Sequence, residues 1–183
     1  MRIGVFFGEG FEEIEALTTV DLLRRAGYDV ETVSVSNTHH VMGAHGVEIK
    51  TDYYISEVSV SAMDMIVLPG GKGHRNLEKC AHLVKRIKKF NDEGKLIAAI
   101  CASPSILGRA GVLEGKKATC YPGFEGELHG ATYTGTEAEW DKNIITGRGA
   151  GTSTAFALKI IEAVSGKEAA EKMAESICYD YYK

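Results

Sequence analysis

The chain lacks the features that mark several large classes of protein. No apolar run approaches the roughly 18 residues that a membrane helix needs, and the apolar stretch after Met1 is too short for a secretion signal. Lysine and arginine together number 21, against 25 aspartates and glutamates, so there is no excess positive charge to neutralise a phosphate backbone. We therefore expect a soluble, cytoplasmic protein that binds neither membranes nor nucleic acid.

Signals for disulfides and for metals are also missing. The four cysteines include no C-x-x-C pair, and a chain of 183 residues is too large to need a disulfide framework. The six histidines include no pair four residues apart, and there is no His-Glu-x-x-His helix. We expect reduced thiols, no metal and no cofactor.

Proline is scarce, with 3 residues, whereas glycine is frequent, with 21. This composition indicates tight turns between many regular elements rather than long irregular segments. The chain has no internal repeat, low-complexity tract or linker. Its length is that of one ordinary domain, so we expect a single domain over residues 1–183.

The pattern of apolar residues predicts an alternation of strands and helices. Met65–Leu68 and Leu96–Ile100 are fully apolar, as strands covered on both faces are. The other expected strands are Arg2–Phe7, Tyr28–Val35, Ala118–Tyr121, Thr132–Tyr133 and Ile144–Thr146, with a hairpin within residues 38–51. The expected helices are Glu12–Ala26, Leu77–Asn91, Pro104–Ala110, one from Thr152 or Ser153 to Val164, and one from Lys167 toward Tyr181. This order predicts an α/β sandwich with a mostly parallel central sheet.

Cys101 is the candidate nucleophile. It follows an apolar strand and precedes a helix that we expect Ser103 to cap and Pro104 to begin. Ligands of such sheets bind at the carboxyl ends of the strands, and unpaired amides at a helix start favour the thiolate. A free cysteine is otherwise often a small buried hydrophobe, which is our interpretation of the remaining three: Cys80, Cys120 and Cys178.

Gly70 and Gly71 end the neighbouring strand in a turn that leaves amides exposed. Together with the amide of Ala102, the amide of Gly71 could form an oxyanion hole. An ordinary glycine turn fits the same residues equally well.

A second candidate lies in the first helix. The segment Gly8–Gly10 begins like a phosphate loop, but the third glycine is missing and Glu12 and Glu13 crowd the helix start. We expect these two glutamates on a solvated face, where they complement the helix dipole. Glu15 is instead expected to point inward toward the strand ends, partly protonated and able to pass a proton to the thiolate.

Four segments, in their order and spacing, resemble the DJ-1/ThiJ/PfpI superfamily, and within it the branch of DJ-1 and YajL. They are Gly10–Glu15, Leu68–Gly71, Ala98–Ala102 and Thr146–Thr152. The resemblance implies a flavodoxin-like sandwich, of the kind that class I glutamine amidotransferases have, and a homodimer without a cofactor. It also implies that Glu15 hydrogen-bonds to the sulfur of a nucleophilic Cys101, and that the amides of Gly71 and Ala102 line a small pocket.

The chain departs from that superfamily in two respects that bear on function. The family has a histidine near the cysteine, in a Thr-His-Pro context, whereas this chain has Cys120, Tyr121 and Pro122. Tyr121 is therefore expected in the pocket, beside Gly70. No histidine directly follows Cys101 and no His-x-Glu pair exists, so proteolysis and glutaminase chemistry both lack their base.

The resemblance implies two functions. One is a stress-response enzyme of glyoxalase or deglycase type, in which the Cys101 thiolate attacks a small aldehyde. The other is a non-enzymatic sensor of oxidative stress, or a redox-regulated chaperone, in which an oxidant converts Cys101 to sulfinate.

Overall fold

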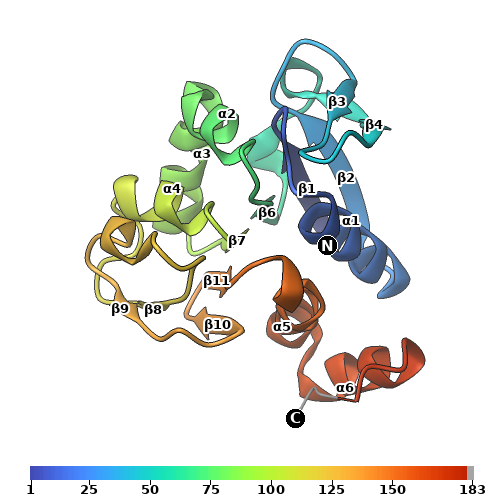
Figure 1. Cartoon of the computed structure of the whole chain (residues 1–183), viewed down its shortest axis with the longest axis vertical. Helices are drawn as coiled ribbons and strands as arrows, with labels where there is room; N and C mark the ends of the chain where they lie inside the picture. The colour runs from blue at the N-terminus through green and yellow to red at the C-terminus, as the bar shows by residue number, and fades with distance from the viewer. Residues whose placement is uncertain (181–183) are drawn as a thin grey trace.

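The centre of the molecule is a seven-stranded sheet flanked by helices (Figure 1). The computed structural model describes residues 1–180. The strand order is β10-β11-β7-β6-β1-β2-β5, and every neighbouring pair is parallel except β10 and β11. The strands are β1 Arg2–Phe7, β2 Asp29–Ser34, β5 Tyr53–Tyr54, β6 Met65–Leu68, β7 Leu96–Ile100, β10 Ala138–Asp141 and β11 Ile144–Gly147. The mostly parallel sheet predicted from the sequence is therefore confirmed.

Helices cover both faces of this sheet. They are α1 Glu13–Arg25, α2 His74–Lys79, α3 Ala81–Asp92, α4 Pro104–Arg109, α5 Ser153–Ser165 and α6 Lys167–Ser176, with short 3-10 turns at Ile55–Glu57, Val60–Ala62, Glu125–Glu127 and Ala150–Thr152. Within β6, Met65 and Val67 pack with the cluster that includes α1, α5 and α6, whereas Ile66 and Leu68 pack with the cluster that includes α2, α3 and α4. A strand buried on both sides must be apolar at every position, which explains its continuous apolar run.

Two small sheets lie outside the central one. The expected hairpin is present, with β3 His40–Met42 antiparallel to β4 Glu48–Lys50. The other pairs β8 Lys117–Ala118 with β9 Thr132–Tyr133, so the strand expected to reach Tyr121 ends at Ala118. No helix within residues 1–180 has the length and apolar character needed to cross a membrane.

Three other expectations about elements were wrong. The helix expected over Leu77–Asn91 breaks at Cys80, whose ψ of 87° separates α2 from α3. Strand β10 was missed because it is a half-exposed edge strand without an apolar run. The final helix ends at Ser176, and the residue Tyr181, toward which it was expected to extend, lies outside the described residues.

The fold brings the ends of β6 and β7 together. The hydroxyl of Ser103, just after β7, donates to the carbonyl of Pro69, just after β6, at 2.6 Å. Ser103 therefore does not cap α4: its own backbone is helical and its side chain makes no capping bond, although Pro104 does begin the helix. The hydroxyl instead fixes one strand end against the other, which is where the candidate residues lie.

The backbone around Gly108 in α4 is so close that it leaves no room for a side chain. A Cβ at Gly108 would overlap the backbone of residues 127–129, whereas a Cβ at Gly151 would meet nothing within 4 Å. Alanine in place of a helical glycine usually stabilises by about 0.5–1 kcal/mol. We expect Gly108→Ala to lower the free energy of unfolding by about 1–3 kcal/mol instead, because backbone cannot move aside cheaply. Urea denaturation checks this, with Gly151→Ala as the unstrained control; equal stabilities of the two variants would contradict the packing described here.

Candidate active site

Cys101 occupies a strained turn directly after β7. Its φ is +66°, a region that residues with a Cβ rarely adopt and that is held only where surrounding bonds enforce it. Here the Cys101 N–H donates to the carbonyl of Gly147 at 2.9 Å, and its carbonyl accepts the Tyr121 N–H at 2.9 Å. The structure thus places Cys101 on the sharp strand-to-helix turn that the sequence indicated.

Glu15 points from α1 into the molecule and is only 1% exposed. Its Oε2 accepts the Gly70 N–H at 2.8 Å, and its carboxyl group lies beside the Cys101 side chain, with which it interacts electrostatically. Oε1 is buried and has no hydrogen-bond partner among residues 1–180. The neighbouring Ile14 is 56% exposed, so the helix buries its acid and exposes its apolar residue. This inversion of the usual preference is expected only where a function requires it.

Burial makes Glu15 a weak acid. Loss of solvent raises its pKa to about 7, although the hydrogen bonds from Cys101 and Gly70 act in the opposite direction. The negative charge of Glu12 adds to the increase. Glu15 therefore carries a proton in about half of the molecules near neutral pH, as an internal proton donor must.

The pKa of Cys101 differs from what the sequence indicated. Burial raises it to about 12, and the charge and hydrogen bond of Glu15 raise it as well, while the amides of Gly71 and Ala102 lower it. The expectation that a helix start alone makes this thiol acidic was wrong, because burial outweighs the amides. The negative charge of an ionised Glu15 opposes formation of the thiolate, so the protonation of one group affects that of the other. The two groups therefore ionise as one coupled pair.

The glycine turn after β6 is required by close approach. A Cβ at Gly70 would lie 2.6 Å from both the Cys101 Cβ and the Glu15 Oε2. Gly71 has a φ of +76°, and its Cβ would lie 2.5 Å from the Glu12 nitrogen. The turn is therefore more than an ordinary connection, since it allows amides to face the sulfur.

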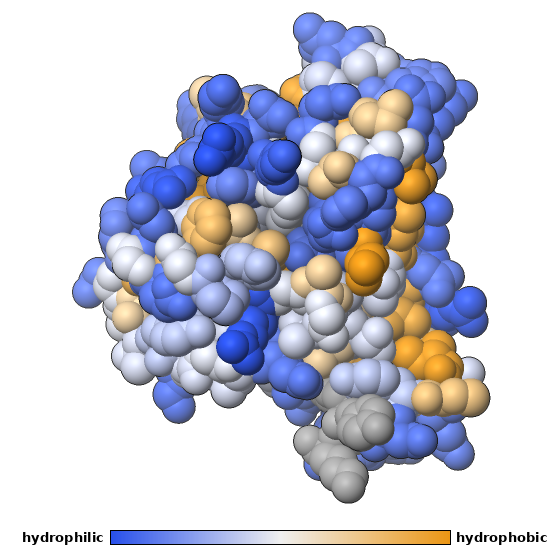
Figure 2. All heavy atoms as spheres, in the orientation of Figure 1, coloured by the Kyte–Doolittle hydropathy of each residue, from blue (hydrophilic) through white to orange (hydrophobic). Residues whose placement is uncertain are grey.

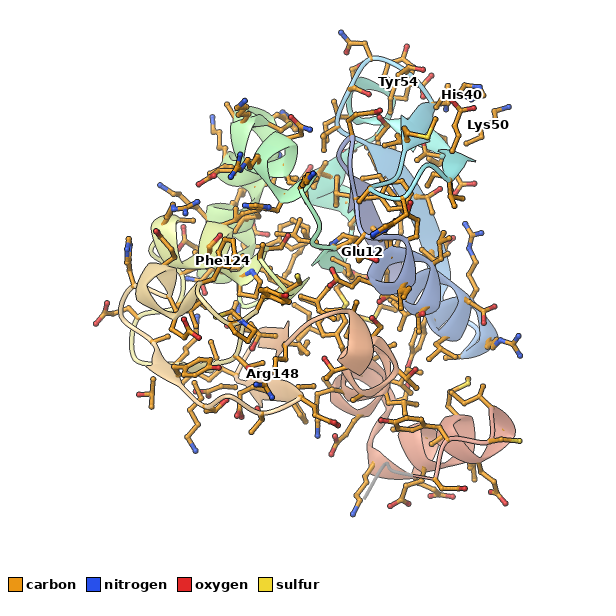
Figure 3. The ribbon with its side chains drawn as sticks, viewed as in Figure 1. Glu12, His40, Lys50, Tyr54, Phe124 and Arg148 are labelled. Atoms are coloured by element: carbon orange, nitrogen blue, oxygen red, sulfur yellow. The ribbon has the colours of Figure 1, made fainter. Side chains whose placement is uncertain are left out.

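A cavity of about 340 Å³ opens above the sulfur. Its lining residues are Gly71, Lys72, His74, Arg75, Cys101, Ala102, Tyr121 and Phe124. Tyr121 is in this wall, as predicted, but Gly70 is not: it lies behind Cys101 and gives its N–H to Glu15. Figure 3 shows Phe124 on the α4 side and Glu12 on the α1 side, with the loop from β6 to α2 between them.

Sequence reasoning missed His74, the imidazole of this cavity. His74 is only 7% exposed, and its ring packs edge-on against Phe124 with the centroids 5.6 Å apart. Its Nδ1 lies 2.8 Å from the Gly71 carbonyl, which can only accept, so Nδ1 carries the hydrogen. The signal in the sequence was a histidine three residues after the second glycine of a strand-end turn.

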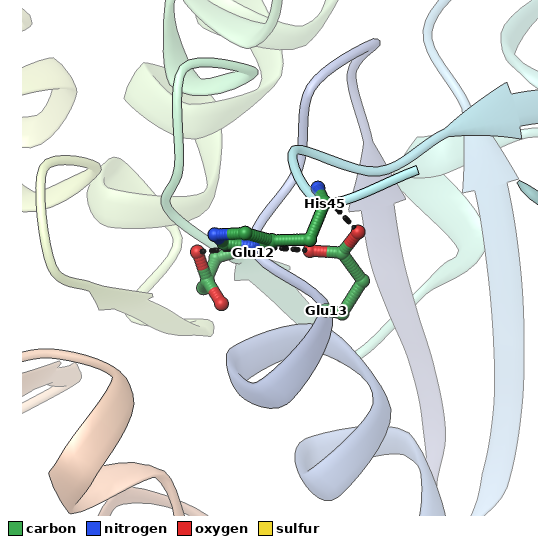
Figure 4. A group of neighbouring side chains, drawn as sticks. All are labelled: Glu12, Glu13 and His45. Carbon is green, nitrogen blue, oxygen red and sulfur yellow. Dashed lines mark hydrogen bonds and ion pairs between the residues drawn. The ribbon is translucent and has the colours of Figure 1, made fainter. Parts of the chain in front are cut away.

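The expectation of a solvated Glu13 was also wrong. Glu13 is 9% exposed, and its two oxygens accept the His45 N–H at 2.7 Å and contact the His45 Nδ1 at 2.9 Å (Figure 4). The hydrogen bond with Glu13, aided by the charge of Glu12, raises the pKa of His45. Burial acts to raise the pKa of Glu13, but the hydrogen bonds from His45 lower it. This ion pair fastens the loop between β3 and β4 to the start of α1.

Glu12, Glu13 and His45 are also the group within residues 1–180 whose ligand atoms could hold a metal ion, since these atoms lie within 4.8 Å of one another. His45 already interacts with both carboxylates, at 2.9 Å and 3.7 Å. An ion pair between acid and base accounts for the cluster, and we assign it a structural role.

The raised pKa of Glu15 predicts a dependence of stability on pH. The ordinary value is 4.5 and the folded value about 7, so the stability associated with the protonated acid is present below pH 4.5 and is lost as pH rises through 7. Between about pH 5 and pH 8, wild-type protein should lose about 3 kcal/mol of unfolding free energy relative to Glu15→Gln. Urea denaturation at both pH values measures this. Exposed Glu175→Gln should follow the wild type, and a Glu15→Gln protein that did the same would refute the assignment.

Comparisons with known proteins agree with this geometry. The family model described as DJ-1/PfpI matches residues 1–163. The chain is 42% identical to protein DJ-1 homolog B of Arabidopsis thaliana over 90% of its own length, but it spans only 38% of that relative. It is 33% identical to the glutathione-independent glyoxalase DJR-1.2 of Caenorhabditis elegans, covering 93% of this chain and 91% of the relative.

Solved structures show the same architecture. The structure of oxidized Toxoplasma gondii DJ-1 superposes with a TM-score of 0.94 at 38% identity, covering 98% of this chain and 99% of the other. The flavodoxin-like sandwich implied by the four sequence segments is thereby confirmed. Because the family model matches most of the chain, from the first strand to the fifth helix, the protein belongs to the DJ-1/PfpI family.

Proposed function

We propose that the protein acts on small reactive aldehydes, as a glyoxalase or deglycase, with Cys101 as the nucleophile. The observation that carries this proposal is the position of the buried Glu15 carboxyl group beside Cys101, which lines a cavity of about 340 Å³. Such a pair supplies a nucleophile and an acid in contact with one another. A relative of similar length is named a glutathione-independent glyoxalase, which supports the same chemistry.

The reaction follows from these groups. In the form with Glu15 protonated, the thiolate attacks the aldehyde carbon of an α-oxoaldehyde, a carbon–sulfur bond forms, and the carbonyl oxygen takes the proton from Glu15. The resulting carboxylate removes the proton on that carbon and returns it to the neighbouring carbon, and the hydroxyl proton moves from the first oxygen to the second, so one carbon is oxidised and the other reduced. Water then hydrolyses the thioester to a 2-hydroxy acid and frees the thiol. The amides of Gly71 and Ala102 stabilise the oxyanions of addition and hydrolysis, and no cofactor enters.

Turnover of methylglyoxal tests this function. We expect Cys101→Ser to abolish lactate formation, because no other thiol faces the glycine turn, and Glu15→Gln to reduce kcat by about 10²–10⁴-fold, as loss of a positioned acid and base does. Lactate released per minute is the readout. The exposed thiol of Cys178 supplies the control, since Cys178→Ser should turn over like wild type. Equal rates for wild type and either site variant would end the proposal.

The alternative function is a sensor of oxidants, or a chaperone that oxidation switches on. The observation that favours it is the environment of the sulfur: two amides and a protonated carboxyl group surround it, and all three can hydrogen-bond to a sulfinate. A structural relative is described as oxidized.

Peroxide treatment separates this function from a purely catalytic one. Two molecules of hydrogen peroxide oxidise the thiolate to sulfinate and leave as water, so mild peroxide should add two oxygens that map to Cys101. Cys80 is similarly half-buried but does not line the cavity above Cys101, so it should remain reduced in the same sample. Peptide mass spectrometry gives the answer, and oxidation spread evenly over all four cysteines would count against the sensor.

We also propose a cytoplasmic homodimer. The apolar residues Ile14 and Leu17 of α1 and Met42 and Val47 of the β3–β4 region are 37–56% exposed. Figure 2 shows hydrophobic side chains along the side of the molecule where α1 and the hairpin lie. Such a face fits a second copy of the chain, which sedimentation in solution would test. The four free thiols suit a reducing compartment.

A further inference from the structure

The cavity above Cys101 has two unlike walls. One wall is a single loop, the segment between β6 and α2 with the first turn of α2, and it contributes Lys72, His74 and Arg75. The other wall contributes the aromatic rings of Tyr121 and Phe124. None of the residues that line the cavity carries a carboxylate.

The two cationic side chains of the loop are free to meet a ligand. Lys72 and Arg75 are exposed, and neither makes an ion pair or a side-chain hydrogen bond with another residue in the described part of the chain. Arg109, by contrast, is held by two carboxylates, Glu78 at 2.7 Å and Glu127 at 2.9 Å. Glu12 and Glu13, at the start of α1, both face His45.

His74 fixes this loop beside the sulfur. Its Nδ1–H bond to the Gly71 carbonyl, at 2.8 Å, ties the loop to the residue whose amide faces Cys101. Edge-on packing against Phe124 joins the loop to the aromatic wall. The unpaired cations are therefore held at the rim of the same small cavity that exposes the nucleophile.

We infer that Lys72 and Arg75 form a subsite for a negatively charged group of the substrate. This inference rests on the proposed function and names its substrate class: α-oxoaldehydes that carry a carboxylate or a phosphate. An Arg guanidinium binds either group through parallel hydrogen bonds, and a Lys ammonium adds a point charge. The anionic group lies at the rim while the aldehyde carbon reaches Cys101 at the floor.

Alkylation of Cys101 tests the subsite without any turnover. Iodoacetate and iodoacetamide are similar in size and differ in charge, and with both reagents the thiolate forms a carbon–sulfur bond and iodide leaves. Peptide mass spectrometry follows both rates at Cys101. Because both reactions need the thiolate, the rate with iodoacetate divided by the rate with iodoacetamide does not depend on how much of the thiol is ionised. We expect this ratio to fall by about tenfold in a Lys72→Met, Arg75→Met double variant, because local positive charge speeds the encounter with an anion.

Two controls accompany this measurement. Lys79 is exposed and lies on α2, as Arg75 does, but it does not line the cavity. Lys79→Met should therefore keep the wild-type ratio of the two rates. High salt should lower the ratio in wild type and have little effect in the double variant, because exposed charges are screened. A double variant with the wild-type ratio would overturn the subsite.

Turnover then tests the substrate class. Methylglyoxal is compared with 4,5-dioxopentanoate, which carries a carboxylate, and with 3-phosphooxy-2-oxopropanal, which carries a phosphate. Wild type should give the higher kcat/KM with one or both anionic compounds, and in the double variant the ratio of kcat/KM for each anionic compound to that for methylglyoxal should fall. A wild type that prefers methylglyoxal to both would overturn the substrate class. If none of the three is converted, the proposed function fails, and the alkylation ratio still decides the subsite.

Discussion

The site depends on one buried carboxyl group. Glu15 is only 1% exposed, and its carboxyl group contacts the Gly70 amide and lies beside the Cys101 side chain. Both contacts are possible only because Gly70 has no Cβ. A charged carboxylate in this position would be costly, so burial keeps the acid protonated to near neutral pH. Burial and an ionised Glu15 both raise the pKa of the Cys101 thiol, and the amides of Gly71 and Ala102 act in the opposite direction. The chemistry of the sulfur therefore follows from the acid rather than from the start of the short helix.

The sheet supplies the rigidity that this arrangement needs. Cys101 adopts a positive φ, a conformation that is retained only when its surroundings fix it. Hydrogen bonds to Gly147 and from Tyr121 hold its backbone on both sides, and the Ser103 hydroxyl joins the turn to the end of β6. These anchors extend from strands that are buried on both faces, so strain at the turn is opposed by the most tightly packed part of the molecule.

Local patterns in the sequence predicted those features that depend on local structure. Apolar runs identified β6 and β7, and their ends identified the turns at Gly71 and Cys101. Burial, however, is a property of the assembled fold, so the sequence could not show that it would outweigh the amides at Cys101. The break at Cys80 was invisible because α2 and α3 send their apolar residues to the same core cluster, which preserves the helical periodicity across it. The pairing of Glu13 with His45 joins residues far apart in the chain, and neither residue signals it alone.

His74 belongs to the part of the site that lines the cavity, which differs in its packing from the part beneath the sulfur. The glycines and Glu15 lie beneath the sulfur and are fixed by contacts that tolerate no added atom. The residues that follow Gly71 face outward into the cavity, where side chains of different size and charge fit. Tyr121 stands where the family resemblance leads one to expect a histidine, and an imidazole instead reaches the cavity from the β6–α2 loop. Because His74 binds the carbonyl of Gly71, the loop that carries the cationic rim also holds an amide against the sulfur. One wall of the cavity and the Gly71 amide beside the sulfur therefore belong to one short segment, while Glu15 comes from α1 and Cys101 follows β7.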